Sequence, residues 1–501
     1  MEDVAKEAPR SDFSFSGLYS RTSTKEFEEP VEGVVSGVIP EWLRGNLIRN
    51  GPGQASVGAD RYRHAFDGLA LLREFTLRDG RAWYRHRFLR SETLRRNQRA
   101  GRIVVSEFGT AAFPDPCATA FERFVSFFSL EDFTDNALVN VTPFGGEQLY
   151  AMTESPFLHR IDPDTLDTLD RTDLRDAVAV HTITAHPLDY GGYTYLIGSR
   201  FTPPRPKYVI VRFPKDGGSV SCSNLEGGQV IAEVAMRSRL YPSYIHSFAV
   251  TEKWIVLLEQ SMVISLPRLL CSKPMGAQGF VSCMSFDPNT NPTVIETAPF
   301  FVFHHVNAFE QNDGREIVVD LCAFEDGAFI KSMHFERADQ DTPTRFAQVR
   351  RFVLRPSDSG SDASPVVVKP ERCFSHAELR GDMPRINDLY NGRRYKHVYM
   401  VSQVEGREDQ VFLSKLDVDT GLWLRWERPG WVPSEPVFVP RPGGEDEDDG
   451  VVLSSLVNVA DEQRLALVVI DAKTFRDVAS VEFETGCEIP ADFHGCFLFT
   501  P

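Results

Sequence analysis

Phe412-Leu-Ser-Lys-Leu-Asp-Val-Asp-Thr-Gly-Leu-Trp-Leu-Arg-Trp426 consists of two short apolar and aromatic runs around an Asp-x-x-Thr-Gly turn. Such runs on either side of a tight turn are typical of an antiparallel hairpin. The same form returns in Leu158 to Asp170 and in Leu465 to Phe483. A hairpin that recurs along a chain is typical of the outer edge of propeller blades, with an ordinary β-sandwich as the alternative.

The length of the chain favours the propeller. Its 501 residues exceed a typical domain of about 100 to 200 residues. Seven blades of roughly 45 residues each would leave room for long loops on one face. Helical periodicity is sparse, the best stretches being 119–130 and 267–270, and no low-complexity linker divides the chain. We therefore predict one all-β domain over residues 1–501, a seven-bladed β-propeller with loops and short helices capping the face that carries the site.

The composition limits the partners and the location. An apolar fraction of 42% with 25% charged residues is that of an ordinary soluble protein. The net charge of -17 argues against a nucleic-acid partner, because phosphate binding needs a basic surface. The eight cysteines are scattered without a CxxC pair, which is typical of reduced thiols. Neither a signal peptide nor a membrane span is evident, so we expect a cytoplasmic protein whose membrane contact is peripheral.

Four of the twelve histidines lie in strand-like, largely apolar stretches: His186, His246, His304 and His494. An imidazole is costly in such surroundings unless both of its ring nitrogens are used. The long intervals between the four exclude a zinc finger or an HExxH helix. The innermost strands of a propeller meet around one axis, where side chains from different blades can converge. The spacing therefore indicates a metal site on the axis, with isolated surface or core histidines as the alternative.

Several motifs along the chain resemble those of the metazoan carotenoid cleavage oxygenases, and together they cover nearly all of it. They are Leu43-Arg-Gly-Asn-Leu-Ile-Arg-Asn-Gly-Pro-Gly53, Phe66-Asp-Gly-Leu-Ala-Leu-Leu72, Ser106-Glu-Phe-Gly-Thr-Ala-Ala-Phe-Pro-Asp-Pro-Cys117, Thr134-Asp-Asn-Ala-Leu-Val-Asn-Val141, Pro433-Ser-Glu-Pro-Val-Phe-Val439 and Glu447-Asp-Asp-Gly-Val-Val-Leu453. The resemblance implies a seven-bladed propeller with one ferrous iron on its axis. It also implies that His186, His246, His304 and His494 are the iron ligands. His304 is chosen over its neighbour His305 because the family's ligand stands three residues before an asparagine, here Asn307.

The resemblance also implies carboxylates that hold the second nitrogens of the ligating imidazoles. Glu154 and Glu435 match two such glutamates of the family. At the third position the chain departs, because Asp382 in Asp382-Met-Pro-Arg-Ile-Asn387 stands where relatives carry glutamate. We expect the shorter side chain to need a small backbone shift or a bridging water, and its hold on a histidine to be looser. Thr153 matches a family threonine that helps to orient dioxygen or substrate beside the iron.

A long conjugated polyene needs an apolar tunnel, and the chain has 37 phenylalanines. Most of these serve core packing, while Phe108, Tyr244 and Phe303 are the candidates for the tunnel wall, where ring faces would stabilise positive charge. Two segments, 119–130 and 263–275, combine apolar with basic residues and are candidates for peripheral contact with intracellular membranes. Cys117 and Cys271 are candidate acylation sites, with buried free thiols as the alternative.

The resemblance implies an iron(II)-dependent dioxygenase that cleaves a carotenoid with O2. The central 15,15' bond of β-carotene is the expected target, which would yield retinal, with isomerisation of one product as a further option. The alternatives are cleavage at the eccentric 9',10' bond, hydrolysis and isomerisation of retinyl esters, and binding of a carotenoid without catalysis. Oxygen uptake separates cleavage from the last two.

Overall fold

The structure is a computed structural model that describes residues 14–112, 134–202, 204–215, 225, 227–268, 283–286, 299–335, 346–355, 370–374, 379–405 and 407–500. Strands dominate it, and the few helices are short. They are the α-helices α1 (Glu92–Ala100), α3 (Leu174–Val178) and α5 (Ala328–Ser332), with the 3-10 helices η1 (Ser16–Tyr19) and η6 (Asp388–Tyr390). The predicted helical stretch 119–130, and half of 267–270, lie outside the described residues.

The three hairpins expected from the sequence are present: β11 (Phe157–Ile161) with β12 (Thr168–Asp173), β28 (Arg407–Asp417) with β29 (Trp423–Trp426), and β33 (Arg464–Asp471) with β34 (Arg476–Glu484). Each turn is held by its first aspartate. The side chains of Asp162, Asp417 and Asp471 each accept a hydrogen bond from the backbone N–H three residues later. Such Asx turns close a hairpin locally, which is why the sequence pattern predicts them.

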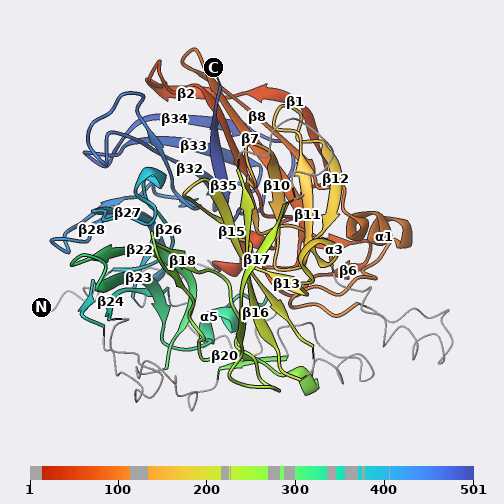
Figure 1. Ribbon diagram of the computed structural model, residues 1–501. Helices are drawn as coiled ribbons and strands as arrows, with labels where there is room; N and C mark the ends of the chain where they lie inside the picture. The colour runs from red at the N-terminus through yellow and green to blue at the C-terminus, as the bar shows by residue number, and fades with distance from the viewer. Residues whose placement is uncertain are drawn as a thin grey trace, which may run out of the picture.

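The strands form antiparallel sheets arranged as a β-propeller (Figure 1). The first sheet consists of β1 (Phe27–Glu32), β8 (Arg81–Phe88), β7 (Leu69–Arg78), β3 (Gly45–Arg49), β35 (Gly495–Phe499) and β4 (Pro52–Gln54). The second consists of β12, β11, β10 (Leu149–Met152) and β9 (Asn140–Pro143). The third consists of β13 (Thr182–Ile183), β14 (Leu188–Tyr190), β15 (Tyr193–Arg200), β16 (Lys207–Pro214) and β17 (Gln229–Ala235).

Three further sheets complete the set of larger sheets. They consist of β22 (Phe301–Gln311), β23 (Glu316–Phe324), β24 (Gln348–Leu354) and β25 (Arg372–Cys373); of β26 (Arg380–Arg385), β27 (His397–Val404), β28 and β29; and of β2 (Val34–Gly37), β34, β33, β32 (Gly450–Asn458), β30 (Trp431–Pro433) and β31 (Val437–Pro440). Three two-stranded sheets are β5 (Ser56–Val57) with β6 (Asp60–Arg61), β18 (Ala249–Val250) with β19 (Ile255–Val256), and β20 (Met262–Ile264) with β21 (Met284–Phe286).

The blade count differs from the prediction of seven, because the described residues form six sheets of four or more strands. Between β17 and β22 they contain only the short pairs β18–β19 and β20–β21. In this region the Gln260 side chain makes hydrogen bonds that a neighbouring strand would otherwise make. The Gln260 amide donates to the Tyr244 carbonyl oxygen and accepts from the Val302 N–H, at 2.9 and 2.6 Å. Backbone groups that are satisfied in this way need no continuous neighbouring strand.

Strands from the two ends of the chain close the ring. β2, drawn in red, pairs with β34, drawn in blue, and β35 pairs with β3 (Figure 1). Gly495 permits the second contact, because a Cβ at this position would lie 2.0 Å from the carbonyl oxygen of Ile48. β35 also contacts β9 and β31, while β22 contacts β18 and β26. These contacts bring the start of β35, and therefore His494, to the axis.

A buried histidine makes stability depend on pH. His86 of β8 is fully buried, with Nδ1 3.0 Å from the Tyr84 hydroxyl and Nε2 2.8 Å from the Lys25 carbonyl oxygen. Burial lowers the pKa of His86 to about 4. In the unfolded chain, His86 takes up this proton near the ordinary histidine pKa of about 6.5. Between these values the unfolded state binds more protons, so the free energy of unfolding falls as the pH falls through this window.

We expect the contribution of His86 to reach about 1.4 kcal/mol per pH unit within that window. The measurement is urea unfolding of the metal-free wild type and of His86→Gln between neutral pH and about pH 4. Glutamine carries a donor and an acceptor but does not titrate, so the variant should show a shallower decline. Equal slopes for the two proteins would contradict the assignment.

Candidate metal centre

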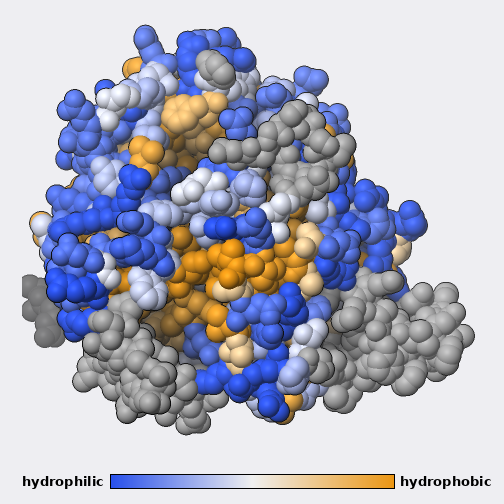
Figure 2. Space-filling model, viewed as in Figure 1, coloured by the Kyte–Doolittle hydropathy of each residue, from blue (hydrophilic) through white to orange (hydrophobic). Residues whose placement is uncertain are grey.

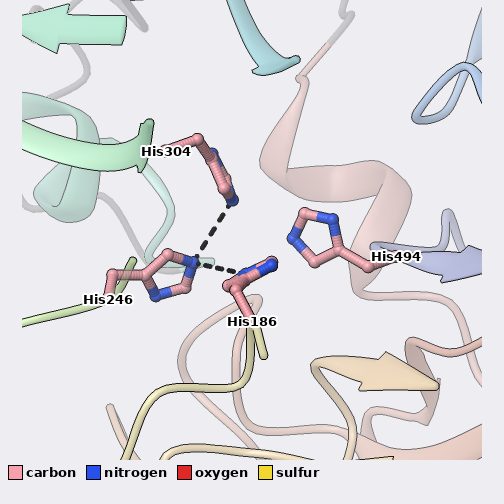
Figure 3. Close-up of side chains that lie close together, drawn as sticks. All are labelled: His186, His246, His304 and His494. Carbon is pink, nitrogen blue, oxygen red and sulfur yellow. Dashed lines mark hydrogen bonds between the residues drawn. The ribbon is translucent and has the colours of Figure 1, made fainter. Parts of the chain in front are cut away.

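Four histidine side chains meet at the centre of the propeller (Figure 3). They are His186, His246, His304 and His494, and one nitrogen of each lies within 4.8 Å of the corresponding nitrogens of the others. The Nε2 atom of His246 is 3.0 Å from Nε2 of His186 and 3.3 Å from Nε2 of His304. The structure thus brings together all four histidines that the sequence singled out.

Each histidine is positioned by a different part of the fold. His186 lies between β13 and β14, and His246 lies three residues before the start of β18. His304 is part of β22, and His494 directly precedes β35. His246, His304 and His494 are buried, while His186 is partly exposed. Because the four come from separate sheets, only the closed ring can assemble them.

Carboxylates bind the outward-facing nitrogens of three of these rings. Nδ1 of His246 lies 2.5 Å from Glu154 Oε1, Nδ1 of His304 lies 2.8 Å from Asp382 Oδ1, and Nδ1 of His494 lies 2.8 Å from Glu435 Oε1. A carboxylate can only accept here, so each Nδ1 carries the proton and each Nε2 presents a lone pair. The three predicted carboxylates are therefore in hydrogen-bond contact with three of the four histidines.

The Nε2 lone pairs of the four histidines are directed at one another, which determines what kind of ion the centre can bind. Burial, followed by the neighbouring histidines, lowers the pKa of His186 well below its ordinary value. Burial also lowers the pKa of His494 to about 4. Neutral imidazoles whose Nε2 atoms lie 3.0 to 3.3 Å apart with lone pairs directed at one another repel unless a cation lies among them. This donor set suits a borderline divalent transition metal.

His305, the neighbour of His304, points elsewhere. Its Nδ1 lies 2.8 Å from the Ser247 hydroxyl, and its Nε2 is a buried atom without a hydrogen-bond partner among the residues that the structure describes. β22 is irregular at this point, since its register against β23 shifts on both sides of His305, and the two adjacent histidines have different contacts. The structure therefore places His304 in the cluster and His305 outside it.

Asp382 reaches His304 directly, whereas we expected a small backbone shift or a bridging water, and a looser hold. The carboxylate is buried, and its distance from Nδ1 equals that of the longer Glu435 from His494. The ladder between β26 and β27 contains a bulge at this point, since Asp382 pairs with Val401 and Arg385 pairs with Tyr399. One extra residue in β26 turns the strand locally. The expected loosening is thus absent from this structure.

A network of buried charged side chains lies next to His494, and the sequence patterns did not predict it. Arg49 donates to Glu435 Oε2 and to Asp492 Oδ1, each at 2.8 Å, and Arg73 donates to Asp492 Oδ2 at 3.2 Å. Arg385 lies 3.6 Å from Glu435. Although burial raises the pKa of Glu435, Arg385, His494 and Arg49 together lower it far below its ordinary value. A charged residue inside the apolar run Leu47-Ile-Arg49 is the signal that could have revealed this network.

The candidate tunnel residues lie at different distances from the cluster. The Phe303 ring is 4.9 Å from the His246 ring, and the Tyr244 hydroxyl donates to Glu154 beside His246. Phe108 is connected to the cluster through a row of rings, since it lies 5.6 Å from Phe66, which is itself 6.1 Å from Phe303. Thr153 is buried and directly precedes Glu154.

Among the described residues, no helix is long and apolar enough to cross a membrane.

Comparisons with known proteins agree on one family. A family model described as retinal pigment epithelial membrane protein matches residues 20–498. The chain is 38% identical to a carotenoid isomerooxygenase of Galleria mellonella, over 96% of each chain. It is 37% identical to a β,β-carotene 15,15'-dioxygenase of Mus musculus, over 95% of this chain and 90% of that protein. A structure of a Synechocystis apocarotenoid oxygenase variant superimposes with a TM-score of 0.76 at 25% identity, covering 96% of this chain and 98% of that one.

Proposed function

Because the chain belongs to the carotenoid oxygenase family, we propose that it is an iron(II)-dependent dioxygenase that cleaves a carotenoid polyene into two aldehydes. The observation that carries the proposal is the convergence of four Nε2 lone pairs on one point, with three of the rings fixed by carboxylates. His186, His246, His304 and His494 would hold the iron. Bound iron would supply the activation of dioxygen that cleavage of a carbon–carbon double bond requires.

The protein's own residues have separate tasks in this proposal. Glu154, Asp382 and Glu435 keep the protons on Nδ1 and so keep the opposite nitrogens free to ligate. The row of Phe108, Phe66 and Phe303 offers ring faces to a polyene and to positive charge that develops on it. Thr153 orients dioxygen or substrate. The reaction is balanced, since one dioxygen supplies the two aldehyde oxygens.

We further infer that the central 15,15' bond of β-carotene is cleaved, which gives retinal. This is supported by the name of the mouse relative, a β,β-carotene 15,15'-dioxygenase that matches over nearly the whole chain. The relatives also include carotenoid isomerooxygenases, so the proposal includes isomerisation of one product during cleavage.

The test is aerobic incubation of iron-loaded protein with β-carotene in detergent, with oxygen uptake followed and products separated by chromatography. We expect retinal and one dioxygen consumed per carotenoid, and neither after a chelator has removed the metal. Longer apocarotenals would overturn the central position of the cut. Absence of oxygen uptake, together with conversion of retinyl ester to an isomerised retinol, would overturn the oxygenase function.

We also propose that the protein is cytoplasmic and contacts membranes peripherally to obtain its substrate. The candidate segment 119–130, and most of 263–275, lie outside the described residues. Support comes from β17, whose residues are all exposed and include Val230, Ile231 and Val234, and from exposed Leu240 and Tyr241. Figure 2 shows a continuous apolar area over the part of the surface where Figure 1 places β17. An interfacial patch of this kind is how a protein takes up a lipid-dissolved molecule.

The seven-bladed count and the single domain remain part of this proposal. The pair β18–β19 lies beside β14 on one side and β22 on the other, which is the position of a reduced blade. In this proposal the pair is the seventh unit around the centre, and each unit supplies one histidine or one carboxylate to it. The pair supplies His246, and the six larger sheets supply His186, Glu154, His304, Asp382, Glu435 and His494.

A further inference from the structure

The rings of Phe108, Phe66 and Phe303 form a row, here called the aromatic row, that leads to the metal centre. Phe66 and Phe108 are partly exposed, whereas Asp67, the residue after Phe66, is fully buried. Ligand sites are lined mostly by apolar and aromatic side chains that keep an accessible face. The groups that fix these rings therefore decide how a polyene lies over the centre.

The Asp67 carboxylate holds the turn that carries Phe108. Its Oδ1 accepts a hydrogen bond from the Gly109 N–H at 2.7 Å, and its Oδ2 accepts one from the Thr110 hydroxyl at 2.5 Å. The Thr110 oxygen accepts from the Arg63 N–H at 2.8 Å, so its own proton points to Asp67. The two oxygens of one carboxylate thus bind the two residues that follow Phe108.

Gly109 allows this turn to lie directly against Asp67 and His64. A Cβ at Gly109 would lie 2.2 Å from the His64 Cβ and 3.1 Å from Asp67 Oδ2. The His64 ring is fully buried and lies 4.8 Å from the Phe66 ring and 5.3 Å from the Phe108 ring. Its Nδ1 also accepts from the Phe66 N–H at 3.2 Å. A shift of the turn would therefore move Phe108 relative to Phe66.

The burial of Asp67 is costly. The groups that donate to it are backbone N–H groups and one hydroxyl, all of them uncharged, and burial raises the pKa of Asp67 to about 7. Glu107, on the other side of Phe108, is buried as well and accepts from the Thr134 hydroxyl at 2.7 Å. Proteins break the rule against buried carboxyl groups mostly at functional sites. Two such groups beside one ring indicate that the place of this ring matters for function.

We propose that Asp67 is a positioning residue of the aromatic row, which acts through Gly109 and Thr110 to fix the Phe108 ring and so selects the double bond that lies at the metal centre. The inference rests on the proposed carotenoid cleavage and deepens it by naming a residue that sets the position of the cut. It holds for a central and for an eccentric cut alike. With Asp67 in place the protein should give one main product, and without it several.

The test is the distribution of products that iron-loaded variants form from β-carotene, separated by chromatography. Asp67→Asn keeps the size of the side chain but has only one oxygen to accept hydrogen bonds. Gly109→Ala keeps the carboxylate, and its Cβ pushes the turn away from His64. Misplacement by about 1 Å can change a rate about 100-fold, so we expect smaller shifts to raise the ratio of secondary to main product about 3- to 10-fold in each variant.

The product ratio separates positioning from stability. A variant that is only less stable has fewer folded molecules, but these form products in the wild-type ratio. If Asp67 acts through the ring, Asp67→Asn should change the ratio little in the Phe108→Leu background. An unchanged ratio in Asp67→Asn overturns the inference, as does an equal change in both backgrounds. Gly109→Ala keeps the test decisive if the asparagine variant fails to fold.

Glu310 provides a matched control, because it binds the same two kinds of donor at another turn. Its Oε1 accepts from the Lys253 N–H and from the Thr251 hydroxyl, each at 2.8 Å, at the turn between β18 and β19. Glu310→Gln should leave the product ratio unchanged. A change as large as that of Asp67→Asn would show that the ratio responds to any loosened turn, and would overturn the inference.

Binding to metal-free protein gives a second measurement that does not need the reaction. The probe is a β-apocarotenal, followed by quenching of tryptophan fluorescence. We expect Asp67→Asn to bind it about 3- to 10-fold more weakly, which corresponds to the loss of one ring contact. A wild-type protein that binds the probe but cleaves no carotenoid overturns the proposed reaction alone, and the binding of Asp67→Asn then decides whether Asp67 holds the row. A wild-type protein that neither binds nor cleaves overturns both proposals.

Discussion

The His304→Ala variant is expected to lose its bound metal and, with it, carotenoid cleavage. His304 contributes one of the four converging nitrogens and is held by Asp382. Removing a group that only supports a ligand costs about 10- to 100-fold in metal affinity, so removing the ligand should cost more than about 100-fold. The measurements are metal content after dialysis against a chelator, and product formation from β-carotene.

His305→Ala is the matched control, because it removes the adjacent imidazole from the same strand. The lost contact with Ser247 is a single hydrogen bond, so we expect a loss of about 1 kcal/mol in the free energy of unfolding and retention of the metal. Loss of metal from His305→Ala together with its retention in His304→Ala would show that the ligand has been assigned to the wrong histidine.

The Arg49→Met variant should be the most destabilised of the single changes considered. Its guanidinium is fully buried and lies between the carboxylates of Glu435 and Asp492, which are equally inaccessible. Methionine would leave two buried negative charges without their shared partner. Removing one partner of a buried ion pair typically costs about 3 to 5 kcal/mol, and we expect a loss in that range or above it in the free energy of unfolding.

Arg44→Met is the control for Arg49→Met. Arg44 pairs with Asp79, but both side chains are about half exposed. An exposed pair contributes about 0 to 1 kcal/mol, so this variant should unfold at nearly the urea concentration of the wild type. Similar losses for the two variants in urea unfolding of metal-free protein would contradict a special role for the buried network.

The features that sequence reasoning could predict are those that depend on near neighbours. The hairpin turns were predictable because Asp162, Asp417 and Asp471 close them with their own side chains. The helix α1 has an equally local signal that was overlooked. The Ser91 side chain accepts from the Leu94 N–H at its start, and Gly101 ends the helix with a positive φ.

Other features depend on residues that are distant in sequence, which no local pattern reveals. The described residues between β17 and β22 form only short strand pairs, and here the Gln260 side chain joins Tyr244 to Val302. The direct reach of Asp382 depends on a bulge whose register is set by β27. The four histidines could be singled out by their apolar surroundings, while the family resemblance implied that they act together as ligands.

The closure of the ring by β3 and β35 has a consequence for synthesis of the protein. Arg49 and Asp492, which meet beside this closure, are 443 positions apart in the sequence. A ribosome therefore releases three of the four histidines long before His494, and the nascent chain carries an open ring with an incomplete centre. Late contacts between distant segments are slow to form and leave strand edges unpaired meanwhile. Metal uptake at the complete centre would then follow docking of β35, which would make metal loading a late event in the maturation of the protein.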